Sequence, residues 1–495
     1  MSPVAMTLLL LASFGVFAYS AWQRWRLMRV AQRPENRADH VGERIRSVLV
    51  YMFGQKRMVR YPAAGIAHVL VFFGFVVLLL NSIILWVRGY DPDFSFGGLF
   101  TLDNPIGVIY AFLRDVFTAL VVIGVVVFFW NRVVLRLRRL TLNPEGLLIL
   151  GIIFVMMIAD LIYEGVEINT RHGGGFHAAM PFASIFAAML TGVPASGLHA
   201  LSHVGFWMHS ALVLIFLNIL PYGKHFHVIT VLPNVFARDL TPVGRLAPVD
   251  DIEGRIEREE PLGVRAVRDF SWKSVLDFYT CTECGRCTDQ CPANQTGKLL
   301  SPKHLTIHLR DHMYERASEW LNSPPKPTNG EAEATPSNEP DEKDLLVSAI
   351  INPETLWACT TCAACETECP VFISYIDKIV DMRRNLAMER GEFPEQLQTM
   401  FQGLERAGNP YSYPNEQRAD WAKGLEMPLR SDKPDAEWLL WVGCGPSFDD
   451  RARRIARATA ELLLHAKVDF AILGPEEMCN GDPARRAGNE FLFQM

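Results

Sequence analysis

Cysteine is absent from positions 1–280, and all ten cysteines of the 495-residue chain lie beyond that point. Eight of the ten form two tight clusters, whose spacing is too short for a conventional disulfide framework. A small secreted protein held together by disulfides is therefore excluded. This use of cysteine predicts a reducing compartment and metal ligation by thiolates.

Two further absences narrow the function. The segment 236–495 shows no basic face interleaved with aromatic residues, so we expect no nucleic-acid partner. The N-terminus, MSPVAMT, has no positive charge ahead of its first apolar run. A secretory signal peptide carries such a charged region, so we interpret the run as a retained helix.

Charged residues are scarce in five long stretches of the segment 1–235. A helix of roughly 20 apolar residues crosses a hydrocarbon core about 30 Å thick, so each stretch predicts a membrane span. The predicted spans are 4–22, 63–87, 105–130, 146–164 and 198–221. The apolar segment 181–190 is too short to span and is predicted to be interfacial or re-entrant. A sixth span there would put the later cysteine clusters on the outside.

Basic residues in the short loops predict the orientation. They gather between the first two spans and after the third, so these loops are expected on the cytoplasmic side. An outside N-terminus and an inside C-terminal half follow. The basic residues concerned are Arg24, Arg26, Arg29, Arg33, Arg37, Arg44, Arg46, Lys56, Arg57, Arg60, Arg132, Arg136, Arg138 and Arg139.

Three histidines are candidate haem ligands. His68 lies about two turns into the second span from the cytoplasmic side. His209 and His227 are separated by five helical turns in sequence, so both share one face if the helix continues past Pro221. Imidazoles from two helices of a bundle can hold a haem iron axially.

This half of the chain resembles the haem-bearing gamma subunit of respiratory nitrate reductases. That family has two ligands ten apart on the second span and two eighteen apart on the fifth, and His68, His209 and His227 match three of the four positions. The fourth falls on Leu78, which cannot bind iron. The three matched positions imply one haem b, held by His68 and His227. In the family the position of His209 belongs to a second, outer haem, and Leu78 takes the place of that haem's other ligand. The alternative is that His68 is a hydrogen-bonded interior histidine and His227 is interfacial.

Four charged residues are expected toward the outer ends of the third and fourth spans, namely Arg114, Asp115, Asp160 and Glu164. Ionisable residues in spans tend to face the bundle interior and to serve a function. They form either an internal ion pair with interfacial acids or a proton path for quinone chemistry, and the sequence leaves both interpretations open.

The two cysteine clusters share one spacing, C-x2-C-x2-C-x3-C-P. This is the bacterial ferredoxin run, in which three thiolates bind one 4Fe-4S cubane and the fourth binds the other. Zinc sites pair two C-x2-C knuckles and do not require this third cysteine and CP ending, so zinc is the weaker interpretation. The first cluster is assigned Cys281, Cys284, Cys287 and Cys369, and the second Cys359, Cys362, Cys365 and Cys291.

The last segment has the pattern of a βαβ unit, with Cys444 after the first strand and Cys479 after the second. The pair resembles the opening half of the cysteine-rich repeat of heterodisulfide reductases. That repeat implies a non-cubane iron-sulfur cluster or a redox-active site, and it continues to a C-x2-C pair that this sequence does not reach. The sequence is therefore expected to be a fragment or to carry an incomplete site. Two unrelated buried thiols are the alternative.

The expected fold is a five-helix transmembrane bundle, followed by an α-helical ferredoxin domain with two 4Fe-4S clusters and a truncated α/β cysteine-rich domain. The Pro-, Ser- and Glu-rich stretch near 323–344 is expected to be a disordered insertion. The predicted boundaries are 1–235 for the membrane cytochrome domain, 236–270 for a linker, 271–395 for the ferredoxin domain, 396–436 for a connector and 437–495 for the cysteine-rich domain.

This order of domains resembles the membrane-bound, heterodisulfide-reductase-related iron-sulfur oxidoreductases of bacteria. The resemblance implies an enzyme of the cytoplasmic membrane that passes electrons from an electron-transferring flavoprotein through two 4Fe-4S clusters and haem b to menaquinone. Its catalytic residues are unknown. Two alternatives remain: a dithiol/disulfide reductase coupled to the quinone pool, and an electron-wiring subunit of a larger respiratory complex.

Overall fold

The computed structural model describes residues 2–322 and 342–495, and the chain forms two compact units. Most of the predicted insertion near 323–344 lies outside the described residues. The units do not follow chain order, because the ferredoxin residues are divided between them. Unit 1 comprises Met1–Leu240, Phe270–Ala332 and Ala364–Ser374, and unit 2 comprises Thr241–Asp269, Glu333–Ala363 and Tyr375–Met495.

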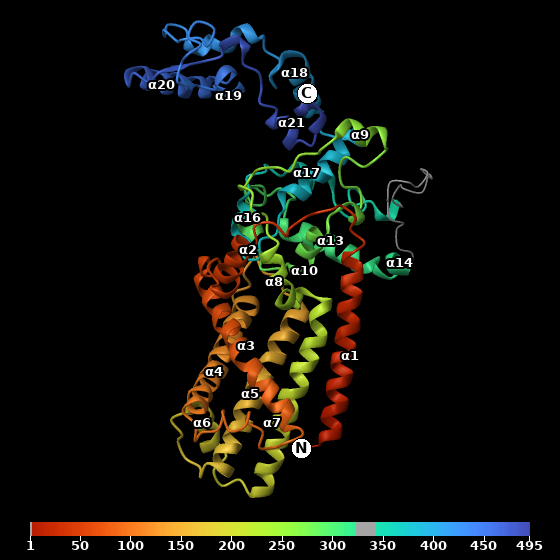
Figure 1. Cartoon of the computed structure of the whole chain (residues 1–495), viewed down its shortest axis with the longest axis vertical. Helices are drawn as coiled ribbons and strands as arrows, with labels where there is room; N and C mark the ends of the chain where they lie inside the picture. The colour runs from red at the N-terminus through yellow and green to blue at the C-terminus, as the bar shows by residue number, and fades with distance from the viewer. Residues whose placement is uncertain (1, 323–341) are drawn as a thin grey trace. The chain divides into compact units, whose positions relative to one another are not determined.

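Long apolar helices dominate unit 1 and run side by side (Figure 1). Among the described residues, five helices are long and apolar enough to cross a membrane, which confirms the number of predicted spans. Each begins at or before its predicted start, and all but the last run past their predicted ends. They are α1 (Pro3–Met28), α3 (Pro62–Arg88), α4 (Pro105–Val133), α5 (Pro144–Arg171) and α7 (Ala195–Ile219).

Two of these helices begin at an Asn-Pro pair. The side chain of Asn104 accepts a hydrogen bond from Ile106 N at 2.9 Å, and that of Asn143 accepts one from Gly146 N at 3.0 Å. Asparagine caps the unpaired amides of a first helical turn, and a following proline loses nothing because its amide would be unpaired there. These pairs therefore set the starts of α4 and α5.

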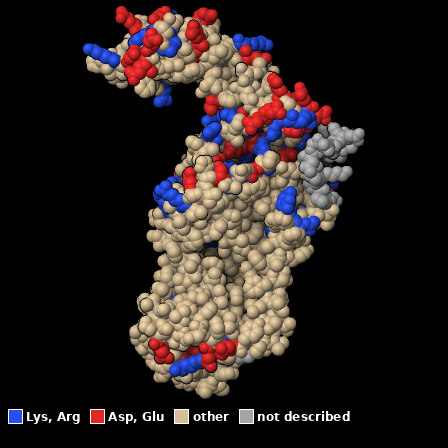
Figure 2. Space-filling model, viewed as in Figure 1, with Lys and Arg blue, Asp and Glu red and all other residues tan. Residues whose placement is uncertain are grey.

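Glycines bring α3 and α4 into close contact. A Cβ atom placed on Gly74 would lie 2.2 Å from Val121 Cγ2, and one on Gly124 would lie 2.8 Å from Val71 Cγ2. Small residues allow membrane helices to approach in this way. On the face shown in Figure 2, the middle of the bundle carries no Lys, Arg, Asp or Glu, as a surface in contact with lipid requires.

Helix α6 (Pro181–Met189) has nine residues and packs against α5. Because an α-helix rises by roughly 1.5 Å per residue, α6 is far too short to span a membrane. This agrees with the interpretation of 181–190 from the sequence. A Cβ atom on Gly165 would lie 2.9 Å from Ala187 N, so this glycine permits the contact.

The helix of the fifth span does not continue past Pro221. The expectation that His209 and His227 share one face of a continuous helix is therefore wrong. Helix α7 ends at Ile219, and two 3-10 turns, Leu220–Tyr222 and Lys224–Phe226, separate it from α8 (His227–Phe236). Proline removes a backbone donor, and the extended conformation of Gly223 (φ −150°, ψ −165°) breaks the helix.

Short helices complete unit 1 around the end of the bundle where α8 lies (Figure 1). They are α2 (Val41–Ser47), a π-helix (Val48–Phe53), a 3-10 turn (Met58–Arg60), α10 (Trp272–Thr280), α11 (Arg286–Asp289), α12 (Pro292–Gln295), α13 (Pro302–Glu315), α14 (Ala317–Asn322) and α16 (Ala364–Glu368).

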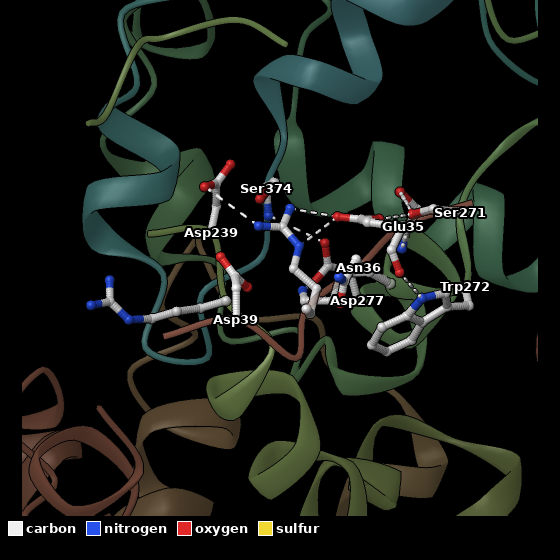
Figure 3. A network of polar contacts seen from close by, with 12 residues as sticks. Glu35, Asn36, Asp39, Asp239, Ser271, Trp272, Asp277 and Ser374 are labelled. Atoms are coloured by element: carbon white, nitrogen blue, oxygen red, sulfur yellow. Dashed lines mark hydrogen bonds and ion pairs between the residues drawn. The ribbon is translucent and has the colours of Figure 1, made fainter. Parts of the chain in front are cut away.

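A polar network ties the segment after α1 to the start of α10 (Figure 3). Trp272 Nε1 donates to the backbone carbonyl of Glu35 at 2.8 Å, and Ser271 Oγ donates to the Glu35 carboxylate. Arg37 pairs with Glu35 at 2.5 Å and with Asp239 at 3.5 Å. Arg37, one of the basic residues from which the orientation was predicted, thus also joins parts of unit 1 to one another.

Unit 2 combines short helices with one pair of strands. β1 (Trp438–Leu439) and β2 (Phe470–Ala471) are parallel, with Trp438 opposite Phe470, and α20 (Asp450–His465) lies between them in sequence. The remaining helices are α9 (Ile252–Glu257), the 3-10 turns Val267–Asp269 and Glu342–Asp344, α15 (Pro353–Trp357), α17 (Ile376–Arg384), the π-helix Asn385–Glu389, α18 (Glu395–Ala407), the 3-10 helix Asn415–Ala422, α19 (Cys444–Phe448), the 3-10 turn Gly474–Glu476, α21 (Asp482–Arg486) and α22 (Glu490–Gln494).

Most of the predicted linker, Thr241–Asp269, and the whole predicted connector are folded parts of unit 2. Val249, Ile252 and Leu262 of the linker form one buried cluster. The connector contains α18 and a 3-10 helix, Asn415–Ala422, whose Trp421 is buried. The Pro- and Asn-rich composition of the connector indicates turns. The apolar side chains between those turns determine which residues are buried.

Candidate functional site

The first cysteine run begins where α10 ends. Cys281 and Cys287 are buried and Cys284 is half-buried. Glu283 and Gly285 have positive φ, 53° and 72°. This left-handed backbone on either side of Cys284 turns the chain sharply, which brings the three cysteines of the run into one loop.

Cys369 joins this loop from a distant part of the sequence. Its thiol interacts electrostatically with those of Cys284 and Cys287, which in turn interact with Cys281. Burial raises the pKa of Cys281 above its ordinary value and that of Cys369 to about 12. The structure therefore gathers the four predicted ligands of the first cluster within unit 1.

The surroundings of these thiols suit a 4Fe-4S cubane. Ile373 N lies 3.4 Å from Cys369 Sγ, and the backbone of Glu283 donates toward Cys281. Amide donors of this kind stabilise and tune cluster sulfurs. In the described parts of the chain, no three His, Cys, Asp or Glu are grouped to hold one metal ion. A cubane binds its four thiolates through different irons, so its ligands are spaced more widely.

Basic side chains from the bundle loops hold the first cysteine loop. Arg139 Nη1 donates to the carbonyl of Cys284 at 2.8 Å, and Arg57 Nη1 donates to that of Cys369 at 2.6 Å. Gly285 makes the approach of Arg139 possible, because a Cβ atom there would lie 2.0 Å from the Arg139 carbonyl oxygen. The sequence had indicated only that both arginines bear on the orientation of the chain in the membrane.

The second cysteine run has the same backbone pattern as the first. Thr361 and Ala363, on either side of Cys362, have φ of 55° and 62°. Thr361 N lies 3.4 Å from Cys359 Sγ, and the buried Arg383 donates to the Cys359 carbonyl at 2.6 Å. Its predicted ligands are divided between the units, with Cys359 and Cys362 in unit 2 and Cys365 and Cys291 in unit 1.

His68 and His227 face a common region of unit 1. Their rings interact electrostatically, although 159 positions separate them in the chain. His227 Nδ1 donates to the carbonyl of Lys224 at 2.8 Å, which leaves Nε2 with the lone pair. The buried Nδ1 atom of His68 has no hydrogen-bond partner. Burial removes the His227 ring from water and lowers its pKa to about 3. The ring is therefore neutral, which is the form of imidazole that can bind a metal.

These observations fit two residues that would hold a haem iron. A ligating histidine usually donates its second ring nitrogen to a carbonyl or carboxylate, as His227 does. An imidazole nitrogen buried without a partner, as in His68, is costly unless a further group satisfies the ring.

His209 has other contacts. Its Nε2 lies 3.1 Å from Ser82 Oγ, and its Nδ1 lies 3.5 Å from Asp160 Oδ1. The side chain is 1% exposed. Both ring nitrogens thus face polar groups of α3 and α5. The buried Nδ1 of His209 lacks a hydrogen-bond partner, as that of His68 does, so these polar neighbours are what distinguish His209 from the His68–His227 pair.

Cys444 and Cys479 lie together in unit 2, where their thiols share a hydrogen bond. Arg418 Nη2 lies 3.1 Å from Cys444 Sγ, and its Nη1 pairs with Glu477 at 3.0 Å. The hydrogen bond between the thiols and the Arg418 charge lower the pKa of Cys479 to about 6, while the pKa of Cys444 is raised.

Arg418 and Glu477 were not predicted from the sequence. The side chain of Arg418 is 1% exposed and that of Glu477 is 2% exposed. Glu477 also accepts amide hydrogens from Val442 and Gly443, at 3.0 and 2.7 Å, and so holds the loop ahead of Cys444. A buried arginine 26 positions ahead of a cysteine leaves no pattern in the sequence that could have revealed this contact.

Comparison with known proteins agrees with the cysteine pattern. Residues 277–373 match the family described as 4Fe-4S dicluster domain. The chain is 33% identical to the Bacillus subtilis protein named "Probable iron-sulfur-binding oxidoreductase FadF" over 99% of this chain and 72% of that protein. The chain belongs to this family of iron-sulfur-binding oxidoreductases.

Other members and relatives agree with that assignment. The chain is 33% identical to the EtfAB:quinone oxidoreductase of Syntrophomonas wolfei over 98% of this chain and 69% of that protein. It is 28% identical to one component of the dihydromethanophenazine:CoB–CoM heterodisulfide reductase of Methanosarcina barkeri, over 43% of this chain and 48% of that component. No solved structure matches significantly. The predicted family is confirmed, and in this oxidoreductase a 4Fe-4S dicluster domain follows the apolar helices.

Proposed function

We propose that this oxidoreductase takes electrons from a cytoplasmic electron-transferring flavoprotein and delivers them through two 4Fe-4S clusters and one haem b to menaquinone. Clusters and haem supply single-electron transfer, and the chain supplies their ligands. Cys281, Cys284, Cys287 and Cys369 hold one cluster, Cys359, Cys362, Cys365 and Cys291 hold the other, and His68 and His227 hold the haem. The relative in Syntrophomonas wolfei bears both EtfAB and quinone in its name, which supports the donor and acceptor classes.

Lys224 links the proposed haem site to the first cysteine run. The backbone carbonyl of Lys224 accepts the hydrogen bond of His227 Nδ1, and its ammonium group lies 3.8 Å from the carboxylate of Glu283, which is in the first cysteine run. Thr280, next to Cys281, donates to Thr230 of α8 at 2.9 Å. Short, bonded connections of this kind keep two redox centres at a constant separation.

A second connection supports the same route. Arg286, beside Cys287, is buried and donates to the carbonyls of Arg57 and Met58 at 2.9 and 3.0 Å. These two residues lead into α3, which carries His68. The first cysteine run is therefore anchored to both segments that bear the haem histidines.

We further propose that the α8 end of the bundle faces the cytoplasm of a bacterium, with the N-terminus outside. The excess of arginine in the loops at that end supports this orientation. The same loops bind the first cysteine run, so the clusters share the side on which a soluble flavoprotein would dock.

A redox-poised optical and EPR titration of the purified protein tests the proposal. We expect one haem b spectrum and two 4Fe-4S signals per chain, and reduction of the haem by reduced flavoprotein. Colourless protein that contains zinc instead of iron and sulfide contradicts the cofactor assignment. Haem that is reduced by dithionite but never by the flavoprotein contradicts the donor.

A dithiol/disulfide reductase is the second candidate, because Cys444 and Cys479 share a hydrogen bond beside Arg418. In that case a disulfide substrate would oxidise both clusters in the absence of flavoprotein. Clusters that stay reduced in the presence of excess disulfide exclude this function.

A further inference from the structure

The membrane bundle contains a second polar site, which the haem proposal does not use. Arg114 of α4 and Glu164 of α5 form an ion pair of 2.5 Å, and each side chain is 9% exposed. The pair lies toward the C-terminal end of α5, the end at which α6 packs, whereas His68 lies near the start of α3 at the opposite end (Figure 1).

The Arg114–Glu164 pair is one part of a connected network. Arg114 Nη1 donates to Asn81 Oδ1 at 3.3 Å, and Asn81 Nδ2 donates to Asp160 Oδ1 at 2.9 Å. Asp160 is 2% exposed and also faces His209. Two carboxylates, of Glu164 and Asp160, therefore face the single guanidinium of Arg114 inside an apolar bundle.

The other charged groups around Glu164 have partners of their own. Asp115 accepts amide hydrogens from Phe182 and Ala183 of α6, at 2.7 and 2.8 Å. Arg88 donates to Tyr163 Oη at 3.5 Å and to the Phe94 carbonyl at 3.1 Å. Glu167 pairs with Arg171 at 3.1 Å. Tyr110 donates to the Val77 carbonyl at 3.4 Å.

Glu164 has one oxygen without any donor. Its Oε2 meets Arg114, but its Oε1 is buried and has no hydrogen-bond partner. Asp160, by contrast, receives the amide of Asn81 at 2.9 Å, and the hydroxyl oxygen of Thr118, which donates to the Arg114 carbonyl at 2.8 Å, lies 3.5 Å from it. An unpaired buried charge is strongly disfavoured, and a carboxyl group that holds a proton removes it. Of the two acids, Glu164 is the one whose carboxylate is less well satisfied.

We propose that Glu164 is a proton-binding site inside the membrane bundle. It holds one proton on Oε1 while Oε2 remains bonded to Arg114, which leaves Arg114 and Asp160 as a balanced pair. Hydrogen bonds from Arg114 to Asn81 and from Asn81 to Asp160 connect this acid to the second buried carboxylate of the bundle. Quinone reduction consumes two protons with two electrons, and a part for Glu164 in that reaction rests on the proposed function.

Infrared spectroscopy of the full chain in lipid nanodiscs, with the spectrum of each variant subtracted from that of the wild type, tests this site without any quinone assay. At neutral pH the wild type is expected to show the carbonyl stretch of a protonated carboxyl, which shifts in D2O. The band should disappear in Glu164→Gln and persist in Asp93→Asn, whose carboxylate is 79% exposed at the same end of the bundle. Cluster spectra report whether each variant is folded and loaded.

Two outcomes overturn the proposal. One is a wild type without the band, and the other is a band that survives Glu164→Gln and is removed by Asp160→Asn. If Glu164→Gln does not fold, Glu164→Asp decides, because moving the carboxyl must shift the band. An unchanged band in Glu164→Asp is a negative result for Glu164. Since quinone is absent throughout, failure of the proposed electron route leaves this test unaffected.

Discussion

Arg57 donates a hydrogen bond of 2.6 Å to the backbone carbonyl of Cys369, across 312 positions of the chain. The same guanidinium nitrogen reaches the carbonyl of Glu366 at 3.1 Å. A residue that contributed to the predicted membrane orientation thus also contacts a predicted cluster ligand. Substitution of the loop arginines can test their contacts with the first cysteine run separately from the predicted orientation.

Replacing Arg57 or Arg139 by Ala is expected to weaken the first cluster. Each loses a charged hydrogen bond to a cysteine carbonyl, worth roughly 1.5–3 kcal/mol. The measurement is the rate at which heating bleaches cluster absorbance, together with iron content per chain. Arg136→Ala is the matched control, because Arg136 is exposed and donates only locally, to Val133. Equal bleaching in Arg139→Ala and Arg136→Ala would refute a role in holding the cluster.

Gly285→Ala should be more damaging than Gly297→Ala. Both glycines have positive φ, 72° and 80°, so both variants carry the backbone strain of roughly 1 kcal/mol. A Cβ atom on Gly285 would collide with the Arg139 carbonyl at 2.0 Å, whereas one on Gly297 meets nothing within 4 Å. Thermal loss of the cluster EPR signal compares the two. Identical melting curves would show that the approach of Arg139 is unimportant.

Changing His68 or His227 to Ala should remove haem and leave both clusters. In the proposed haem site the two imidazoles would come from different helices, so either loss would leave only one protein ligand. Pyridine haemochrome analysis measures the haem, and EPR measures the clusters in the same sample. His225→Ala is the control, because His225 lies two positions from His227 and contacts Glu145 at 3.3 Å. Full haem content in His68→Ala would rule out this residue as a ligand.

Arg418→Met is expected to open the loop ahead of Cys444. Breaking a buried ion pair leaves Glu477 uncompensated, at a cost of roughly 3–5 kcal/mol. Hydrogen–deuterium exchange at Val442 and Gly443, whose amides bond to Glu477, should accelerate at least tenfold. Adding Glu477→Gln should reverse part of the effect, since it removes the orphaned charge.

Arg430→Ala serves as the control for this experiment, because the Arg430 side chain is exposed and contacts only the Ala436 carbonyl at 3.5 Å. Unchanged exchange in Arg418→Met, or the same acceleration in Arg430→Ala, would show that the buried pair does not hold the loop.

The sequence alone determined those features that are written in consecutive residues. Apolar runs identified five spanning helices because desolvation in a bilayer acts on each segment separately. The C-x2-C-x2-C-x3-C-P spacing identified the dicluster domain because three of the four ligands of each cubane lie within one short loop. The same local reasoning failed at Pro221, where it allowed a continuous helix and the extended Gly223 ends it.

Tertiary structure decided which distant residues meet. No spacing connects Arg139 to Cys284, His68 to His227, or Arg418 to Cys444. These contacts depend on how helices pack, and packing is set by volume and burial across the whole unit. The charges of Arg114 and Glu164 were visible in the sequence, but only their pairing left one buried carboxyl oxygen without a donor.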